Sequence, residues 1–343
     1  MRPRLAPVAP VFLAALTALA ALAALGVAPA PARAEVATLK IASLAPEGSA
    51  WMKIFNDWKA AVDKRTAGQV KVKFYAGGVA GDERDVVRKM RLGQMSGAAI
   101  TAVGLGLIQP DVRVLEIPFL FRDESELDLV RSTLDAEFRK KFEEKGYQLL
   151  AWGDVGPVRL FTNVPLRDRA DLQKMKMWVW NDDPLLARLF AQLSITSVPL
   201  GVPDVLPSLQ TGLIDACNGS PLAAVALQWH SRVKYATSMQ VSYAIGAIVL
   251  ARKQWEALTP EQRSAVGEEA RTMSDGLTRL VRNDNAAALK KMQAQGIEVV
   301  PTPAPLEAAF RAAGKAATDE LTGKLFSKEF RERVEKILAS KRK

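Results

Sequence analysis

Two kinds of hydrophobic periodicity follow one another along residues 37–163. Alternating apolar positions with β-branched side chains predict strands, and apolar positions spaced three and four apart predict amphipathic helices. Strand and helix succeed one another from the start, which predicts an α/β lobe with a mainly parallel sheet. Strands are expected over 37–45, 68–78 and 97–104, and helices over 51–66 and 81–95. Residues 114–121 and a helix over 124–146 continue the alternation. Residues 147–163 are expected to form a strand and crossover.

A second lobe is predicted from residue 174 onward, where shorter elements follow one another. An apolar strand within 243–258 is expected to return towards the first lobe, and 259–296 reads as one long helix with Thr259 as N-cap and Pro260 at its first position. A short strand and two helices complete the chain. The shorter elements are a strand over 174–180, a helix over 183–193, a loop over 194–204, a helix over 205–212, a strand over 213–220 and a helix over 221–235.

The stretch KMKMWVWNDDP, residues 174–184, combines a strand with a helix start. In an extended strand Lys176, Trp178 and Trp180 share one face. That face either packs beneath a helix, as suits aromatic strand residues, or lines a ligand site. Pro184 suits the first position of the following helix. Its N-cap is expected to be one of three residues, Asn181, Asp182 or Asp183.

Residues 1–34 have the layout of a secretory signal peptide. Arg2 and Arg4 precede an Ala/Leu-rich run, and ARA ends at Ala34 as an A-x-A cleavage site would. An uncleaved anchor is the alternative, because the run approaches the roughly 20 residues that span a bilayer. The single cysteine, Cys217, lies far downstream, which excludes a lipoprotein. We expect an exported, periplasmic protein that is not transmembrane after cleavage, with 309 residues left when 34 of the 343 are removed.

The charge of the mature chain is modestly positive. Loss of Arg2, Arg4 and Arg33 from 47 basic residues leaves 44 against 37 acidic ones, a net charge of +7. The signs are mixed along the helices, which indicates a solvated surface with a mild preference for anionic ligands and no nucleic-acid partner. One cysteine permits no internal disulfide, and a chain of this length usually divides into two lobes.

The sequence lacks the residues for most enzyme chemistry. His230 is the one histidine, so an HExxH zinc site is impossible, and its helical setting favours a structural role. GxSxG, GxxxxGK[ST] and GxGxxG motifs are absent, and VGLGL supplies a glycine pair only. Cys217 is expected to be a small buried residue, and the pairs Asp82–Glu83 and Asp182–Asp183 to start helices. We expect a protein without enzymatic activity, cofactor or metal-binding residues, although a metal ion bridging ligand and protein stays open.

Several segments in order resemble the extracytoplasmic solute-binding proteins of TRAP (tripartite ATP-independent periplasmic) transporters, of the DctP type. Together they span nearly all of the mature chain. The segments are KIASLAPEGSAW, RTAGQVKVKFYAGGVAGDERDVVRKMRLGQM, LEIPFLFRD, GPVRLFTN, DLQKMKMWVW, VPLGVPDVLPSLQTGLIDACNGSPLAA and LTPEQRSAV.

The resemblance implies an α/β, two-lobed periplasmic binding protein of the type II-like kind, with crossing hinge strands and a long helix spanning both lobes. After the signal peptide of residues 1–34, we expect lobe I over 35–156 plus about 245–284 and lobe II over 157–244 plus about 285–343. The ligand would be trapped when the lobes close.

The resemblance also implies where the ligand lies. The first arginine of the family's site matches Arg159 in GPVRLFTN, whereas the position of the second, carboxylate-gripping arginine holds Trp178 in DLQKMKMWV. The family's asparagine falls near Ser220 in ACNGSP, which also contains Asn218, and an aromatic position falls near Val202 in PLGVPD.

Three further residues are candidates for the cleft. Trp51 either lines it from the first lobe or seats its helix on the sheet. Thr101 ends a buried strand, where ligand sites of α/β proteins usually form. Trp180 shares its strand face with Trp178.

The tryptophan at position 178 predicts an unusual specificity. A buried arginine holds a carboxylate with charge-assisted bonds worth about 2–5 kcal/mol, and an indole offers one N–H donor and an apolar face. Either Arg159 or Lys176 supplies the cation, or the ligand is not a dicarboxylate. A monocarboxylate with an apolar or aromatic part fits, with its acid group on Arg159 and its body against the indole.

We therefore expect a binding protein that captures a small organic acid by lobe closure and delivers it to the small and large membrane subunits of an ion-gradient-driven TRAP permease. The alternatives are the binding protein of an ABC-type importer, an exported enzyme or a sensor domain. The lack of a nucleophile–base set weakens the enzyme, and the lack of a later membrane span weakens the sensor.

Overall fold

In the computed structural model, which describes residues 36–342, ten strands form a continuous sheet. Its order is β2-β1-β3-β9-β4-β7-β5-β6, and β8 joins β4 to β10. The predicted signal peptide, residues 1–34, lies outside the described residues. The strands are β1 (Ala37–Ser43), β2 (Val70–Tyr75), β3 (Gly97–Thr101), β4 (Tyr147–Thr162), β5 (Lys176–Trp180), β6 (Thr196–Leu200), β7 (Ala216–Gly219), β8 (Tyr235–Thr237), β9 (Ser242–Ala251) and β10 (Glu298–Val300).

Two strands connect the halves of this sheet. In the first half β1 pairs in parallel with β2 and β3, and in the second β5 pairs in parallel with β6 and β7. The 16-residue strand β4 pairs with β9 along Tyr147–Val158 and then with β7 along Arg159–Thr162. The chain therefore has the predicted α/β, two-lobed architecture with crossing strands.

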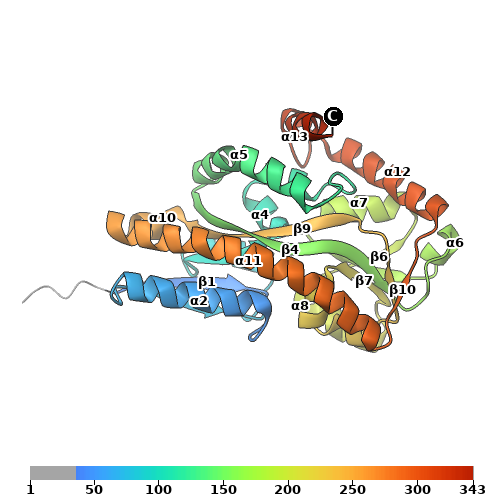
Figure 1. Ribbon diagram of the computed structural model, residues 1–343, viewed down its shortest axis with the longest axis horizontal. Helices are drawn as coiled ribbons and strands as arrows, with labels where there is room; N and C mark the ends of the chain where they lie inside the picture. Colours follow the sequence, from blue (N-terminus) through green and yellow to red (C-terminus); the bar gives the residue numbers. More distant parts are fainter. Residues whose placement is uncertain (1–35, 343) are drawn as a thin grey trace, which may run out of the picture. The chain divides into compact units, whose positions relative to one another are not determined.

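Helices cover both halves of the sheet, and Figure 1 shows α11 running diagonally past β4 and β9. They are α2 (Ala50–Arg65), α3 (Glu83–Arg91), α4 (Ala102–Ile108), α5 (Glu124–Glu144), α6 (Arg169–Leu172), α7 (Pro184–Gln192), α8 (Val202–Thr211), α9 (Pro221–Ala226), α10 (Arg252–Glu256), α11 (Pro260–Ala294), α12 (Ala304–Leu321), α13 (Lys328–Lys341) and the 3₁₀ helices η1 (Pro110–Glu116) and η2 (Trp229–Arg232).

The 35-residue helix α11 spans both lobes, as predicted. It packs against α2 in the first half, β4 in the middle and α9 in the second half. At about 1.5 Å per residue it is roughly 50 Å long. Its start carries the predicted cap: Thr259 accepts from the backbone of Gln262, whose side chain accepts from Thr259 in return.

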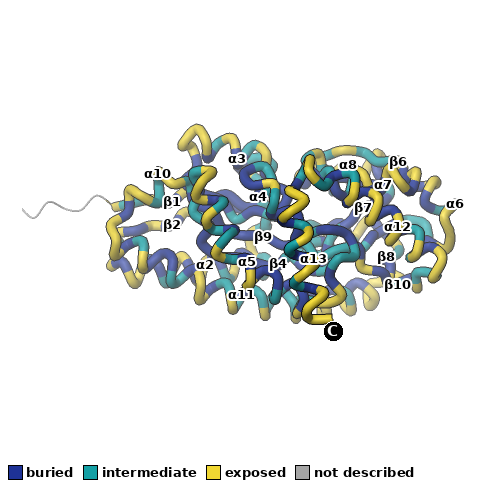
Figure 2. The backbone as a smooth tube through the Cα atoms, turned by 90° about the horizontal axis from the view of Figure 1, so that it is seen from above, coloured by how far each residue is buried: buried dark blue, intermediate teal, exposed yellow. Residues whose placement is uncertain are grey.

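Strand β5 sends alternate side chains to opposite faces, as predicted. Met177 and Val179 join a core with α7 and α12, and Trp178 and Trp180 pack on the other face with Trp229. Cys217 is fully buried in that second core, where burial raises its thiol pKa, in agreement with the expected apolar role. Figure 2 shows buried residues concentrated along the strands.

Three local predictions were wrong. Residues 194–204 are not all loop, because 196–200 form the edge strand β6, where Pro199 is tolerated since an edge strand has one unpaired side. Residues 114–121, which we expected to continue the alternation of strand and helix, contain no strand; η1 ends there. The helix over 221–235 breaks at Gln228, which has a φ of 60°, so His230 lies in η2 and not in an amphipathic helix.

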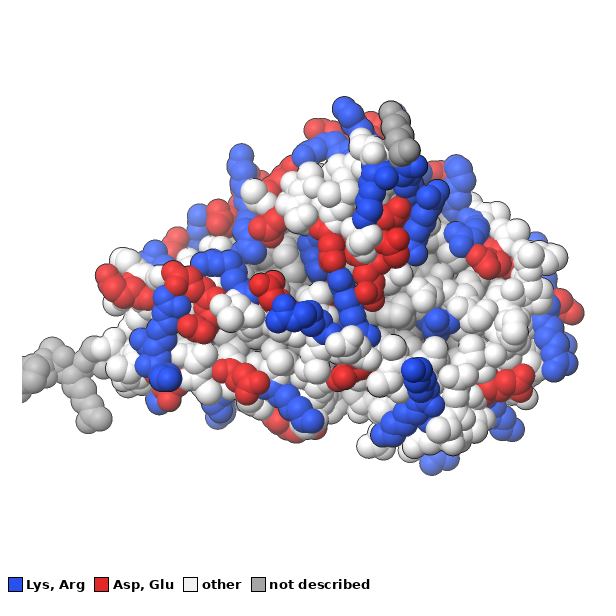
Figure 3. All heavy atoms as spheres, viewed as in Figure 1, with Lys and Arg blue, Asp and Glu red and all other residues white. Residues whose placement is uncertain are grey.

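The C-terminal helices pack on different halves. Helix α12 lies against α7, whereas α13 lies against α5 and η1. The lobe II expected from the sequence includes both helices, within about 285–343, and the division of the chain into lobes stays a proposal. Within residues 36–342, no helix is long and apolar enough to cross a bilayer. Figure 3 shows acidic and basic side chains intermixed on one face.

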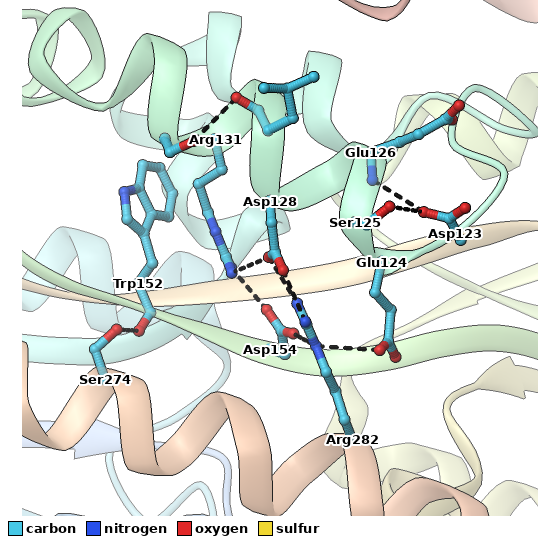
Figure 4. Close-up of polar contacts among 12 residues, drawn as sticks. Asp123, Glu124, Ser125, Glu126, Asp128, Arg131, Trp152, Asp154, Ser274 and Arg282 are labelled. Carbon is cyan, nitrogen blue, oxygen red and sulfur yellow. Dashed lines mark hydrogen bonds and ion pairs between the residues drawn. The ribbon is translucent and has the colours of Figure 1, made fainter. Parts of the chain in front are cut away.

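A partly buried ion-pair cluster, centred on the buried Asp154, connects β4 to two helices (Figure 4). Asp154, in the middle of β4, is 5% exposed; its oxygens accept from Arg131 Nη1 of α5 at 2.7 Å and Arg282 Nε of α11 at 2.8 Å. Asp128 of α5 accepts from both arginines, and these bonds raise the pKa of Arg282. The cluster fixes the long helix and α5 on the crossing strand.

We predict that Asp154→Ala lowers the free energy of unfolding by roughly 3 kcal/mol, because it leaves two arginines partly unpaired in a buried site. Urea unfolding followed by circular dichroism measures the change. Asp63→Asn, at the exposed pair of Asp63 with Lys71, is the control and is expected to change stability by less than about 1 kcal/mol. Equal losses in both variants would contradict the role assigned to the cluster.

Candidate functional site

A cavity of about 190 Å³ lies beside the crossing strands β4 and β9, with residues of both halves of the sheet in its wall. Its wall is mostly apolar, which suits a small ligand with a few placed polar groups. Seven of the eight residues predicted for the site line it: Trp51, Thr101, Trp178, Trp180, Val202, Asn218 and Ser220.

Tryptophans form much of the wall. Five of the seven in the chain line the cavity, namely Trp51, Trp152, Trp178, Trp180 and Trp229. The Trp178 ring lies 5.1 Å from Trp229, edge to face, and 6.1 Å from Trp180. Trp178 Nε1 donates to Leu200 O at 3.0 Å, so its single N–H is already bonded within the fold. Trp178 thus belongs to a core and to the cavity wall at once, and it offers a ligand an apolar face.

The predicted polar residues on the wall are also bonded within the fold. Asn218 Nδ2 donates to Trp178 O at 2.9 Å, and Ser220 Oγ accepts from Ala223 N at 3.1 Å as the cap of α9. Thr101 Oγ1 donates to Glu83 Oε2 at 2.9 Å. These residues shape the wall, and their contact with a ligand stays a prediction.

The remaining two wall residues predicted from the sequence are largely apolar. Trp51 Nε1 donates to Asp154 O at 3.1 Å, which connects the start of α2 to β4. Val202 is the first residue of α8 and is 7% exposed.

The two cations considered for the ligand's acid group lie off the wall. Arg159 does not line the cavity; its Nη1 donates to Thr237 O at 2.8 Å and to Ser238 O, and burial lowers its pKa. Lys176 is exposed and donates to Gly212 O. Arg159 as an acid-binding residue therefore stays a prediction without a contact that places it at the cavity.

Charged residues that the sequence did not single out as site residues do line the cavity. They are Glu83, Arg113, Glu116, Asp154 and Asp183. Arg113 is 2% exposed; its Nη2 donates to Asp183 Oδ1 at 2.7 Å and lies 3.3 Å from Glu116 Oε2. Its Nε and Nη1 are buried without a hydrogen-bond partner among residues 36–342. Arg113 is the one arginine in the described part of the wall, which contains no lysine.

Two buried glutamates lie close to Arg113. Glu83 accepts from Thr101 N at 2.7 Å and Gly104 N at 2.7 Å, and Glu116 accepts from Ile245 N at 3.1 Å. Burial disfavours their charged forms and raises the pKa of each to about 7. Both carboxyl groups therefore change charge near neutral pH.

The glycine pair of VGLGL makes room for this cluster. A Cβ at Gly104 would lie 2.6 Å from Glu83 Oε2, and one at Gly106 would lie 2.9 Å from Arg113 Cδ. Both contacts are too close for a side chain, so the pair serves close packing of α4 and not a phosphate loop.

Three polar contacts join the halves of the molecule beside the cavity. Trp180 Nε1 donates to Asp82 Oδ2 at 2.7 Å, Arg84 Nε donates to Asp182 Oδ2 at 2.9 Å, and Arg113 bonds Asp183. The predicted helix-start residues thus have a second role. Asp183 caps α7, as expected, and also binds Arg113, whereas Asp82 makes no capping bond and binds Trp180. In the described part of the chain, no group of three or more His, Cys, Asp or Glu side chains is arranged to hold a metal ion.

Comparisons with known proteins identify relatives of most of the folded region. The sequence profile of DctP, "Bacterial extracellular solute-binding protein, family 7", matches residues 41–325. The C4-dicarboxylate-binding periplasmic protein DctP of Rhodobacter capsulatus is 26% identical over 269 residues, covering 78% of this chain and 80% of that protein.

Two solved structures have the same fold. A TRAP periplasmic solute-binding protein from Citrobacter koseri with bound D-glucuronate has a TM-score of 0.80 at 23% identity, covering 88% of this chain and 98% of that one. DctP7 of Bordetella pertussis, an extracytoplasmic solute receptor binding pyroglutamic acid, has a TM-score of 0.82 at 18% identity, covering 88% and 99%.

We predict that Glu116→Gln becomes more stable relative to the wild type as the pH rises. The pKa of this carboxyl group rises from 4.5 to about 7 on folding, so the free energy of unfolding falls as the pH increases through that window. The complete loss, above the window, is roughly 3 kcal/mol. The neutral amide removes this contribution. Urea unfolding at pH 5 and pH 8 measures the difference between variant and wild type; a difference that does not change with pH contradicts the prediction.

Proposed function

This chain belongs to the DctP family of bacterial extracellular solute-binding proteins (family 7), and from this premise we propose that it captures a small organic acid by closure of its two lobes and delivers the acid to the membrane subunits of a TRAP permease. The permease would be driven by an ion gradient and consist of a small and a large subunit. The protein itself acts in the periplasm, after residues 1–34 have directed its export.

The observation that carries this proposal is a cavity between two halves that are bonded to each other beside it. Each of the bonds Trp180–Asp82, Arg84–Asp182 and Arg113–Asp183 has one partner on each half. Such bonds break when the halves separate about the crossing strands, which would open the cavity to solvent. A ligand bound between the halves adds contacts to both and favours the closed arrangement.

The cavity wall supports a monocarboxylate with an apolar or aromatic part. Indole faces from Trp51, Trp178, Trp180 and Trp229 suit an apolar body, and one arginine suits one acid group. The ligands named for the two structural neighbours, D-glucuronate and pyroglutamic acid, each carry one carboxyl group.

We propose that the ligand contacts the predicted residues on the wall, and that Arg159 contributes only if its side chain leaves the carbonyl groups of Thr237 and Ser238. Ser220 and Asn218 retain hydrogen-bonding capacity beyond the bonds they make in the fold, since a hydroxyl and an amide have several donor and acceptor sites.

We predict that small monocarboxylates raise the melting temperature of the wild type. A ligand at 100 times its Kd adds about 2.7 kcal/mol to the free energy of unfolding. Differential scanning fluorimetry with phenylacetate, 4-methyl-2-oxopentanoate, L-pyroglutamate, D-glucuronate and succinate, each against its methyl ester or amide, measures the shift. Stabilisation by the neutral compounds alone would contradict an acid-binding function.

We predict that Trp178→Phe weakens binding of phenylacetate more than binding of D-glucuronate, because a phenyl ring offers less apolar surface than indole. Isothermal titration calorimetry measures both affinities. Trp58→Phe is the matched control: Trp58 is buried and its Nε1 also donates to a backbone carbonyl, but it does not line the cavity. Equal effects of the two substitutions would remove Trp178 from the ligand site.

A further inference from the structure

We propose that Arg113 binds the carboxylate of the solute and limits the solute to one acid group. This inference rests on the proposed function, because it takes the solute to be an acid. It goes further by naming the side chain that recognises the acid group. This side chain lies on η1 in the first half, far along the chain from the strand that carries Trp178.

Arg113 has unused hydrogen-bonding capacity in a buried position. Its Nη2 bonds Asp183, whereas Nε and Nη1 have no partner within the described residues. Nε carries one hydrogen and Nη1 carries two, so three of the five N–H donors of the guanidinium remain. Leaving charged donors buried and unbonded is unfavourable, and the two oxygens of a carboxylate would satisfy them.

The side chain of Arg113 is closely packed and held in one position. Its stem passes over Gly106, where a Cβ would lie 2.9 Å from Cδ and 3.0 Å from Cγ. Asp183, the N-cap of α7, accepts a hydrogen bond from Nη2 and lies on the opposite half of the molecule. The guanidinium is therefore placed before a ligand arrives, which reduces the entropy lost on binding.

The other arginines nearby do not line the cavity. Arg131 and Arg282 are bonded to Asp128 and Asp154 and do not line the cavity. Arg159 lies off the wall; its Nη1 bonds two backbone carbonyls, and its Nε is buried without a partner among residues 36–342. An acid inside the cavity consequently has Arg113 as its cationic partner among the described wall residues.

The carboxyl groups around Arg113 set the charge that fits. Glu83 of α3, Glu116 of η1 and Asp183, the N-cap of α7, all interact with it, and Asp82 lies next to Glu83. When all are ionised, the acidic groups outnumber the arginine, so a second carboxylate on the solute would be repelled. This charge balance excludes dicarboxylates and admits monocarboxylates.

The same balance couples binding to protonation. A bound carboxylate disfavours the ionised forms of Glu83 and Glu116, whose pKa values are already raised to about 7 by burial. Binding the anion then takes up a proton above that pH. The affinity for a monocarboxylate is expected to fall by up to about tenfold per pH unit above neutrality for each proton taken up.

Calorimetric titration with phenylacetate and L-pyroglutamate at pH 6.5 and 8.5 tests the proposal, applied to the full mature chain. Arg113→Met is expected to weaken binding of both acids about 30-fold or more, and Arg159→Met to weaken it less. Arg311→Met, at an exposed arginine paired with Glu307, controls for loss of a positive charge and should leave both affinities within about twofold.

Glu116→Gln provides a second test that does not depend on the fold of the Arg113 variant. A glutamine can still accept from Ile245 N, and it lacks the negative charge beside Arg113. It is expected to bind both acids several-fold more tightly at pH 8.5 and to lose part of the pH dependence.

Three results would decide against the proposal. Binding by Arg113→Met within threefold of the wild type overturns the role of Arg113 alone. Glu116→Gln that binds no more tightly than the wild type at pH 8.5 overturns it as well. If the wild type binds neither these acids nor any other of the thermal-shift panel, the proposed function itself fails, and the role of Arg113 fails with it.

Discussion

The arrangement of the molecule depends on one interaction, the pairing of the buried Asp154 carboxylate with two arginines. This carboxylate lies in the middle of the strand that belongs to both halves of the sheet, and it receives one arginine from α5 and one from α11. A charge in this position is stable only when it is fully paired, so the strand and both helices must meet in one geometry. The backbone carbonyl of the same residue holds Trp51 at the cavity wall. Asp154 therefore positions both the helices that pack on β4 and a tryptophan of the cavity wall.

A second charge cluster, around Arg113, has the opposite character. Asp154 is satisfied by its partners, whereas Arg113 keeps free donors and is surrounded by carboxyl groups that titrate near neutral pH. Removing one partner of a fully paired buried charge destabilises a fold, whereas an incompletely paired charge in a cavity is typical of a ligand site. The bond from Arg113 to Asp183 also joins the two halves, so acid recognition and lobe closure act on the same side chain.

The order of the elements could be predicted from the sequence because most of them follow simple periodicity. The strand–helix alternation, the long helix from Thr259 and the alternation of Trp178 and Met177 on β5 were all confirmed. The edge strand β6 was missed because Pro199 interrupts its pattern, and the break at Gln228 depends on a local left-handed conformation. These features are set by tertiary contacts and leave little periodic signal.

The uncharged residues of the candidate site could be predicted from the sequence, and its charged residues could not. Tryptophans on a strand face are visible in the sequence, but the charged members are not, because their roles depend on partners far along the chain. Arg113 bonds Asp183, 70 positions away, and Glu83 bonds Thr101. One signal was present: Arg113 stands within the apolar run VRVLEI, where a charge is expected to be buried and paired. The glycine pair of VGLGL was a second signal, because both glycines make room for the charged residues around Arg113.

The measurement that tests this account most directly is a crystal structure of the protein with L-pyroglutamate or phenylacetate bound. We expect both carboxylate oxygens within about 3.2 Å of Arg113 nitrogens, with the rest of the acid against the indole of Trp178. A carboxylate bound instead by Arg159, with Arg113 still paired only to Asp183 and Glu116, would contradict the account.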